Sequence, residues 1–452
     1  MSKGLTDVAD GRAFHPAGAF VLRYLFQSSL VRSSAVYTVS TVINAAIPLL
    51  ILPVLTRYLT PADYGIVAMM GVLVGIASPF IGLNIHGAIA VKYFDTGRTD
   101  LARYIGNCFL LLSVSTAAMS VILWLFGGSI SAITAFPQDW LAIIVVICIS
   151  QFVVLILLTL WQMQDKPVAY GSFQVLQTAL NIALTIVLVV GLRMNWQGRV
   201  EAQAGSVLVC AVIALIVLRR RGWIRFSYDR GDVRHALKFG VPLIPHALGA
   251  MLIIQTGRIF ITNMVSVADT GVYMVGFQLA MIVELFAASF NKAYAPWLYK
   301  RLSVGDPYVK RRIVKLTYLY FAGILVFAAS LSLFMPWFLS FFVGKDFAGA
   351  GKYTTWIALG FAFSGMYYMV ANYIFYAGAT HVLAWITFAT ASFNVLFNYV
   401  LITMNGAVGA AQASALALFV SFVLTWILSA RVYSMPWNLI RARPATPDAM
   451  ET

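Results

Sequence analysis

Charged residues are scarce in this sequence. They make up 10% of its 452 residues, while 61% are hydrophobic. Soluble proteins carry roughly 25% charged residues, so a chain this long with so few charges cannot cover a surface that faces water. The composition excludes a soluble protein and predicts a polytopic membrane protein.

Cysteine is scarcer still, with three residues in the chain. Cys108, Cys148 and Cys210 all fall inside long apolar segments. Free cysteine in such surroundings behaves as a small apolar residue, and nothing in the spacing suggests a disulfide framework. We expect three packing residues and no disulfide.

Motifs of catalysis and metal binding are missing as well. The sequence contains no P-loop, no CxxC pair and no HExxH, and its five histidines are scattered without metal-ligand spacing. The predicted outside loops are all short, whereas membrane glycosyltransferases and polymerases generally need a larger outer loop or domain. We therefore expect a transporter without cofactor or metal, driven by a gradient, the membrane potential or downhill substrate flow.

What the sequence does contain is a series of long apolar segments. About 20 apolar residues are enough to cross a bilayer as a helix. Twelve segments have suitable length, at about 34–56, 64–90, 102–126, 139–161, 168–191, 200–218, 241–264, 269–292, 313–335, 352–376, 381–403 and 406–430. The predicted fold class is all-α, with about twelve transmembrane helices.

The distribution of lysine and arginine predicts the orientation in the membrane. With the N-terminus in the cytoplasm, 24 of the 31 Lys and Arg residues lie in cytoplasmic segments and five lie in outside loops. This bias follows the positive-inside rule, so both termini are expected in the cytoplasm, with no signal peptide before the first span. It also explains most of the net charge of +15, so no nucleic-acid partner is expected.

A basic cytoplasmic stretch divides the spans into two sets of six. We expect an N-terminal cytoplasmic segment at 1–32, an N-lobe at 33–218, the basic linker at 219–238, a C-lobe at 239–432 and a cytoplasmic tail at 433–452. Because six is an even number, the two sets enter from the same side as parallel repeats. Two such bundles usually enclose a central cavity and alternate its access.

The two halves share a short motif at an offset of 206 residues. LTPADYGIVAMMG at 59–71 falls on VSVADTGVYMVGF at 265–277, which aligns Asp63 with Asp269 and a glycine two residues later in each half. In both halves the motif lies on the predicted outer face, between the first two spans. We expect the aspartates to cap the starts of two helices.

Several segments resemble one family of bacterial transporters. They are LPVLTRYLTPADYGIVAM at 52–69, WQMQDKPVAYG at 161–171, LKFGVPLIPHALGAMLIIQTGRIFIT at 237–262 and GVYMVGFQLAMIVELFAASFNKAYAPWLYKRL at 271–302. They are similar to the O-antigen-type polysaccharide-biosynthesis flippases of the multidrug/oligosaccharidyl-lipid/polysaccharide exporter superfamily. The resemblance covers most of the chain outside its two ends.

The resemblance implies two lobes around a V-shaped cavity in the bacterial inner membrane. It implies that undecaprenyl-diphosphate-linked oligosaccharide is moved to the outer leaflet for O-antigen, capsule or exopolysaccharide synthesis. The implied partners are this cargo, membrane lipids and a polysaccharide polymerase or export machinery. The alternatives are a drug/cation antiporter of the same superfamily, a flippase for another polyprenyl-linked cargo, and a membrane glycosyltransferase or polymerase.

A diphosphate cargo needs cationic ligands in a wet cavity. Arg258 lies deep in the seventh span, and Gln255 and Thr262 lie within about 60° of it on a helix. Such a polar stripe is costly against lipid. We predict Arg258 and Gln255 as substrate ligands, the alternatives being an arginine that reaches the outer interface and a structural ion pair.

Glu284, near the middle of the eighth span, is the candidate for a coupling ion. Hairpin geometry separates Glu284 from Arg258 by about 12 Å in depth, at 1.5 Å per residue, so no direct bridge between them is expected. An unpaired carboxylate near the midplane can carry a proton or Na⁺. The alternative is a protonated carboxyl bonded to a neighbouring helix.

Three more basic or titratable residues are candidate ligands for the cargo. Lys292 and His86 match at the 206-residue offset and are placed at the cytoplasmic mouth. Arg57 ends the first span on the outer side, where it could guide the head group out. The alternatives are interface anchors for Lys292 and Arg57, and a packing role for His86.

His246 is the last candidate ligand, for the sugar or the diphosphate. It follows Pro242 and Pro245 in the seventh span. Prolines inside a helix remove a hydrogen bond and cause kinks. We therefore expect a kink near the cytoplasmic end of this span, suited to a gating hinge.

Overall fold

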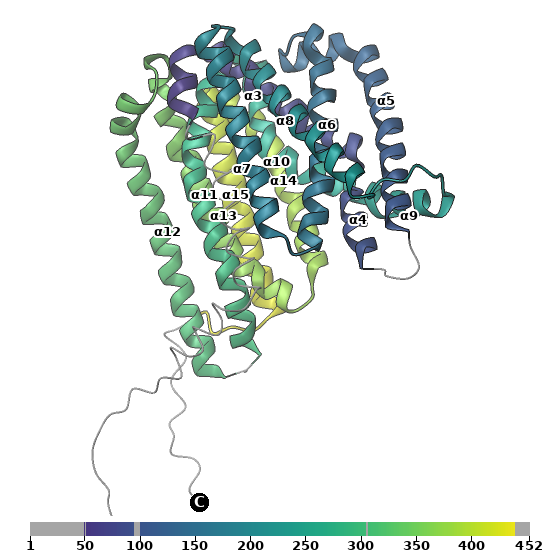
Figure 1. The fold of residues 1–452 in the computed structure, drawn as a ribbon. Coiled ribbons are helices and arrows are strands. Elements are labelled where there is room, and N and C mark those ends of the chain that lie inside the picture. The colour runs from purple at the N-terminus through teal and green to yellow at the C-terminus, as the bar shows by residue number, and fades with distance from the viewer. Residues whose placement is uncertain (1–48, 50, 95–99, 304–305, 439–452) are drawn as a thin grey trace, which may run out of the picture.

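The computed structural model describes residues 49, 51–94, 100–303 and 306–438 (Figure 1). Every regular element in these residues is a helix, which confirms the all-α fold class. Ten of the described helices are long and apolar enough to cross a membrane, and a bent pair gives an eleventh. The first predicted span lies mostly outside the described residues, and its end is helical at 51–58.

The N-terminal half is built from six long or medium helices after that segment. They are α3 (Pro61–Gly82), α4 (His86–Tyr93), α5 (Leu101–Thr134), α6 (Leu141–Met163), α7 (Pro167–Thr185) and α8 (Asn195–Arg220). A π-helical stretch at Ile186–Gly191 prolongs α7. One hydrophobic core, with members from Met70 to Ala236, holds this half together.

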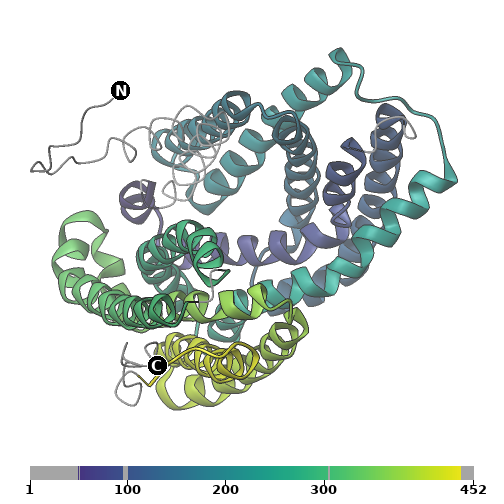
Figure 2. The ribbon, with the colours of Figure 1, turned by 90° about the horizontal axis from the view of Figure 1, so that it is seen from below.

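The C-terminal half has a core of its own, with members from Ile261 to Met435. Its helices are α10 (Ile244–Met264), α11 (Val267–Leu302), α12 (Pro307–Phe342), α13 (Gly351–Tyr376), α14 (Thr380–Asn405) and α15 (Ala407–Val432). Viewed from below, the helices of the C-terminal half, green to yellow, gather on one side, and most helices of the N-terminal half lie on the other (Figure 2). A third hydrophobic cluster joins the halves, with Tyr64 of α3 and Val275 of α11 among its members. The fold is therefore a polytopic bundle in two lobes.

The three cysteines are buried and free, as the sequence predicted. All three belong to the core of the N-terminal half. The Sγ atom of Cys148 lies 3.6 Å from the carbonyl oxygen of Val74 in the neighbouring helix α3. They act as small packing residues.

The second span is broken, which the sequence did not predict. α3 ends at Gly82, and α4 begins at His86. Leu83 and Asn84 adopt φ values of 47° and 52°, a left-handed conformation that a continuous helix cannot contain. The predicted continuous helix over 64–90 is wrong at this point.

The seventh span bends at a different place from the one predicted. Helical structure runs from Arg230 to Gly249 through both Pro242 and Pro245, and a 55° bend separates it from Ile254–Met264. Pro242 sits in a short 3-10 turn and Pro245 at the start of α10, where a missing N–H costs little. The prolines thus mark a helix junction, and the bend follows one turn later.

The basic linker docks on the N-terminal half. After α8 the chain is irregular up to Asp229, and α9 (Arg230–Gly240) follows. Arg103 at the start of α5 forms ion pairs with Asp229 at 3.5 Å and Asp232 at 3.0 Å. Arg225 pairs with Asp100. These three ion pairs fasten the linker to the start of α5.

The repeated motif starts two equivalent helices. Thr60 and Ser266 are the N-caps of α3 and α11, and each accepts a hydrogen bond from the backbone N–H of the aspartate three residues on. Asp63 bonds back to the N–H of Thr60 at 3.0 Å. The aspartates therefore complete the capping motif from inside the helix, and the hydroxyl residues, which the sequence reasoning passed over, are the caps.

The two capped helices cross each other through the motif's glycines. A Cβ atom on Gly65 would collide with the carbonyl oxygen of Val267, and one on Gly271 would collide with that of Pro61. Both pairs obey the 206-residue offset, so the two contacts are related by the internal repeat. The absence of side chains lets the helix backbones approach this closely.

Hydrogen bonds between the two lobes gather at the same end of the molecule. Among the described residues, the Arg57 side chain donates to Phe341, Tyr64 to Gln278 and Asn263 to Ile133, and the N–H of Gly344 donates to Thr56. All four bonds lie at the end where α3 and α11 begin. On the predicted orientation, this end faces outside.

Candidate functional site

A small cavity lies between the two lobes, just inside this closed end. Its volume is 160 Å³. We call it the interlobe pocket, and its lining residues are Ile51, Leu55, Tyr64, Val67, Ala68, Met70, Gly71, Arg199, Gln203, Arg258, Met274 and Gln278. Because both lobes contribute to its wall, any relative motion of the lobes must change its shape.

Arg258 reaches this pocket from α10. Its side chain is buried, with 5% of its surface exposed, and its guanidinium carbon lies 4.8 Å from the centre of the Phe277 ring on α11. The Nε atom has no hydrogen-bond partner in the described structure. The cost of an unpaired cation in such a site is high, so this arrangement favours an anionic ligand.

Arg199 is a second arginine in the same wall. It lies one turn into α8, and its Nη1 donates to Asn181 Oδ1 at 3.1 Å and Thr185 Oγ1 at 3.3 Å. These neutral partners orient the guanidinium and leave its charge uncompensated. Its Nε has no partner among the described residues.

The sequence reasoning missed Arg199 because it placed the residue in an outside loop. The helix in fact begins at Asn195, five residues before the predicted start of the span. Gln203, one turn after Arg199, also lines the pocket. This polar spacing of four residues was the signal that could have extended the helix and revealed its polar face.

The pocket also contains a hydrogen bond that ties the lobes together. Tyr64 on α3 donates to Gln278 Oε1 on α11 at 2.8 Å. None of the described residues that line the pocket is a carboxylate. The described lining thus contains two guanidinium groups and several polar side chains but no acid. Such a lining suits an anion with several acceptor oxygens.

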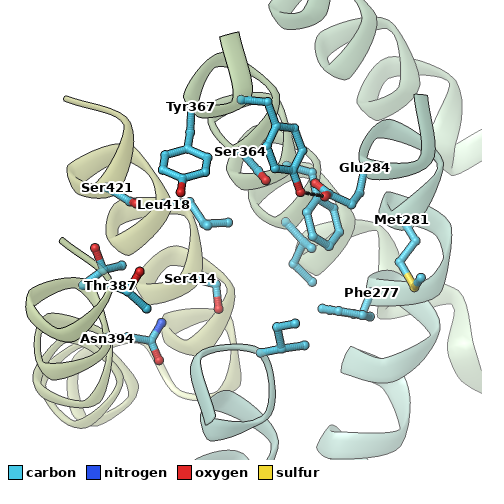
Figure 3. Close-up of a pocket in the computed structure, with 15 residues that line it drawn as sticks. Phe277, Met281, Glu284, Ser364, Tyr367, Thr387, Asn394, Ser414, Leu418 and Ser421 are labelled. Atoms are coloured by element: carbon cyan, nitrogen blue, oxygen red, sulfur yellow. Dashed lines mark hydrogen bonds between the residues drawn. The ribbon is translucent and has the colours of Figure 1, made fainter. Parts of the chain in front are cut away.

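A larger cavity, the C-lobe pocket, lies within the C-terminal half (Figure 3). Its volume is 460 Å³. It is lined from α10, α11, α13, α14 and α15 by Ile254, Phe277, Met281, Glu284, Ile357, Phe361, Ser364, Tyr367, Tyr368, Thr387, Thr390, Asn394, Ser414, Leu418 and Ser421. Apolar surface alternates with hydroxyl groups and one carboxylate.

Glu284 is the charged residue of the C-lobe pocket. Its Oε1 accepts a hydrogen bond of 2.6 Å from Tyr368 of α13, while its Oε2 has no partner in the described structure. No ion pair joins Glu284 to Arg258, in agreement with the hairpin geometry. The described residues contain no group of three or more His, Cys, Asp or Glu side chains that could hold a metal ion.

The other predicted ligands lie apart from both pockets. Arg57 is exposed at the end of the first span and donates to the carbonyl of Phe341 at 3.4 Å. Lys292 is exposed on α11, and His86 is half-buried at the start of α4. Gln255 lies three residues before Arg258 and lines neither pocket. The side chain of His246 falls outside the described part of the chain.

Comparison with known proteins gives both a family and a set of relatives. Residues 30–301 match the family described as polysaccharide biosynthesis protein. Two relatives from Haemophilus influenzae are named "Uncharacterized membrane protein" and "Lsg locus putative protein 1". They are 27% and 24% identical to this chain, over 78% of its length and 85% and 86% of their own.

Solved structures share the fold at low sequence identity. The lipid II flippase MurJ in an inward closed conformation matches with a TM-score of 0.70 and 12% identity, over 87% of both chains. An inward-facing multidrug resistance MATE transporter of the MOP superfamily matches with a TM-score of 0.64 and 13% identity, over 86% of this chain and 94% of that one. The two-lobed helical fold is common to all three, and with residues 30–301 matched, the chain belongs to the polysaccharide biosynthesis protein family.

Proposed function

We propose that this protein flips undecaprenyl-diphosphate-linked oligosaccharide across the bacterial inner membrane for surface polysaccharide synthesis. The observation that carries the proposal is the interlobe pocket, which Arg258 and Arg199 both line and to which the described residues contribute no carboxylate. A diphosphate supplies the charge and the oxygens that two guanidinium groups need. The family and the flippase among the structural neighbours support the same cargo class.

The mechanism that we propose is alternating access. The lobes are hydrogen-bonded at the end that we assign to the outside, so this conformation would receive the head group from the cytoplasm. Rocking of the lobes, with the seventh span bending between Gly249 and Ile254, would break these bonds and release the head group outside. Both termini are then cytoplasmic, and a polymerase or export complex would take the product.

The membrane potential favours this direction of transport. An inside-negative potential drives anions outward by roughly 2.3 kcal/mol per charge per 100 mV. If Arg258 and Arg199 move together with the diphosphate, their positive charges reduce the net charge that crosses the membrane. The free energy gained from the potential is then smaller.

Complementation of a flippase-deficient strain tests the proposal. We expect Arg258→Ala and Arg199→Ala to abolish surface polysaccharide although each variant is inserted at normal levels. Arg230→Ala is the matched control, because Arg230 is exposed at the start of α9, away from both pockets. Normal polysaccharide in both pocket variants would contradict the proposal.

The drug/cation antiporter is the rival function within the same superfamily. A second measurement distinguishes this antiporter from a flippase: the efflux of a cationic dye by cells that express the protein. The interlobe pocket repels cations, so we expect no efflux above background. Dye efflux together with failed complementation would replace our proposal with the rival.

A further inference from the structure

We infer that the C-lobe pocket binds the sugar attached to the diphosphate, and that it selects an uncharged or amino-bearing sugar over an acidic one. This inference rests on the proposed function and deepens it, because it assigns part of the substrate to a second cavity. Its evidence is the position of the C-lobe pocket beside Arg258, together with the lining and the charge of that pocket.

The two pockets share a wall. On α10, Ile254 lines the C-lobe pocket and Arg258, one turn later, lines the interlobe pocket. On α11, Phe277 and Gln278 are consecutive residues that line different pockets. The Arg258 guanidinium lies over the ring of Phe277, which lines the C-lobe pocket. A diphosphate held at Arg258 would therefore carry its sugar next to this pocket.

The lining of the C-lobe pocket suits a carbohydrate. Figure 3 shows Tyr367, Ser364, Thr387, Ser414 and Glu284 arranged around a common space. Aromatic rings can cover the C–H faces of a sugar, while hydroxyl groups exchange hydrogen bonds with its hydroxyls. The volume of 460 Å³ lies within the range of about 300–1,000 Å³ for small-molecule pockets.

Two polar atoms at the pocket have no partner within the described structure. Thr390 is 3% exposed, and its Oγ1 makes no hydrogen bond. Oε2 of Glu284 is also buried without a partner. Buried polar atoms are normally satisfied, so a hydroxyl and a carboxylate oxygen left over at one cavity indicate a ligand with hydrogen-bond donors.

The charge of the pocket sets its selectivity. Glu284 is the one charged residue among the described residues that line it, and it accepts a hydrogen bond from the Tyr368 hydroxyl. A carboxylate accepts hydrogen bonds from sugar hydroxyls and attracts an amino group, but it repels another carboxylate. A uronic acid next to the diphosphate is therefore bound more weakly than an uncharged sugar.

The test uses full-length protein in nanodiscs and three probes of equal lipid length. The first probe is farnesyl diphosphate. The second carries glucose on the diphosphate, and the third carries glucuronic acid there. We expect the wild type to bind the glucose probe at least about tenfold more tightly than the glucuronic acid probe, a difference of ~1.4 kcal/mol. Glu284→Gln is expected to reduce this preference.

Variants of the pocket lining separate the sugar from the diphosphate. Tyr367→Leu and Thr390→Val are expected to weaken binding of the glucose probe several-fold and to leave farnesyl diphosphate binding unchanged. Tyr399→Leu and Thr403→Val are the matched controls, because both residues are exposed on α14 outside the pocket. Thr390→Val preserves side-chain shape, so it reports on the sugar even if Tyr367→Leu fails to fold.

The outcomes distinguish this inference from the proposed function. One result is that the wild type binds farnesyl diphosphate, Arg258→Ala abolishes this binding, and the pocket variants bind the glucose probe as tightly as the wild type does. This result would overturn the sugar site and leave the flippase proposal standing. Equal losses for the sugar-bearing and sugar-free probes would also overturn it. If the wild type binds none of the three probes, the proposed function fails and the inference fails with it.

Discussion

At the scale of single residues, the structure changes the meaning of the charges inside the membrane. Arg258 could be predicted from the sequence, because a cation in the middle of an apolar span is unusual. Arg199 was missed, because it stands one residue before the predicted start of its span at 200, where a charge looks like part of a loop, while the helix in fact begins at Asn195. The hydroxyl groups of the C-lobe pocket gave no signal, since serine and threonine are common in membrane helices for packing.

Arg258→Lys tests whether the shape of the guanidinium matters as well as its charge. Lysine keeps the charge but loses the fork that contacts two oxygens at once. The loss of one charge-assisted hydrogen bond, about 1.5 kcal/mol, corresponds to about tenfold weaker binding of farnesyl diphosphate. Binding by the variant at wild-type affinity would show that Arg258 acts as a point charge.

Glu284→Gln tests the proposed coupling role of this carboxylate. The amide has nearly the same shape and cannot take up a proton or balance a bound cation. If Glu284 couples transport to a gradient, flipping in proteoliposomes by the variant becomes independent of an imposed pH or Na⁺ gradient. A variant that responds to both gradients as the wild type does would remove Glu284 from coupling.

At the scale of elements, the helices were more predictable than their junctions. Spans of 20 or more apolar residues are set by the thickness of the bilayer, so spans two to twelve are found as helices. The break at Leu83 and the bend after Gly249 depend on contacts with other helices, which local sequence does not reveal. Gly240, for example, packs against the carbonyl oxygen of Leu83 at the break in the second span.

The attachment of the linker to α5 is expected to depend on pH. The backbone N–H of Asp232 donates to Asp229 and holds the pKa of that carboxyl below its usual value, and Arg103 adds to the effect. A carboxyl whose pKa is lower in the folded than in the unfolded protein stabilises the fold at pH values above its unfolded pKa of about 3.9. This stabilisation is lost as the pH falls through the folded pKa.

Thermal unfolding of wild type and Asp229→Asn measures this contribution. The wild type should have the higher midpoint at neutral pH, and the difference should shrink as the pH falls below about 4. Asp165→Asn is a control at the turn between α6 and α7, which is without these ion pairs. A difference between wild type and Asp229→Asn that does not change with pH would contradict the prediction.

At the scale of the whole molecule, the two lobes are held together at one end. This arrangement follows from the repeated motif, whose equivalence between halves was visible in the sequence. Which face of each helix meets the other lobe was not visible, because both halves are apolar all round. The structure shows these faces through the contacts of Gly65 and Gly271 with the opposite helix.

Gly271→Leu is expected to shift the protein toward the conformation open to the outside. The new side chain would collide with the Pro61 carbonyl, so the lobes must separate at this end. A single reporter cysteine, Gln278→Cys, in a chain with its three native cysteines replaced by alanine, should then react faster with a membrane-impermeant thiol reagent added outside. Gly323→Leu is the control, because Gly323 has open space around it.

Unchanged labelling of the reporter in Gly271→Leu would contradict the assignment of this crossing as the outer gate. Faster labelling in both glycine variants would indicate general loosening instead. Complementation should fall in Gly271→Leu, since a transporter that stays in one conformation cannot complete its cycle.

The glycine crossing has the geometry of a homodimer interface inside one chain. Gly65 meets the start of α11 and Gly271 meets the start of α3, which is the reciprocal pattern that a two-fold axis imposes on identical subunits. Each glycine is therefore half of a self-complementary surface. A Cβ atom on Gly271 would also lie 2.9 Å from the Gly65 nitrogen, so a side chain at either glycine disturbs both contacts. The two positions are therefore expected to vary together rather than independently over the course of evolution.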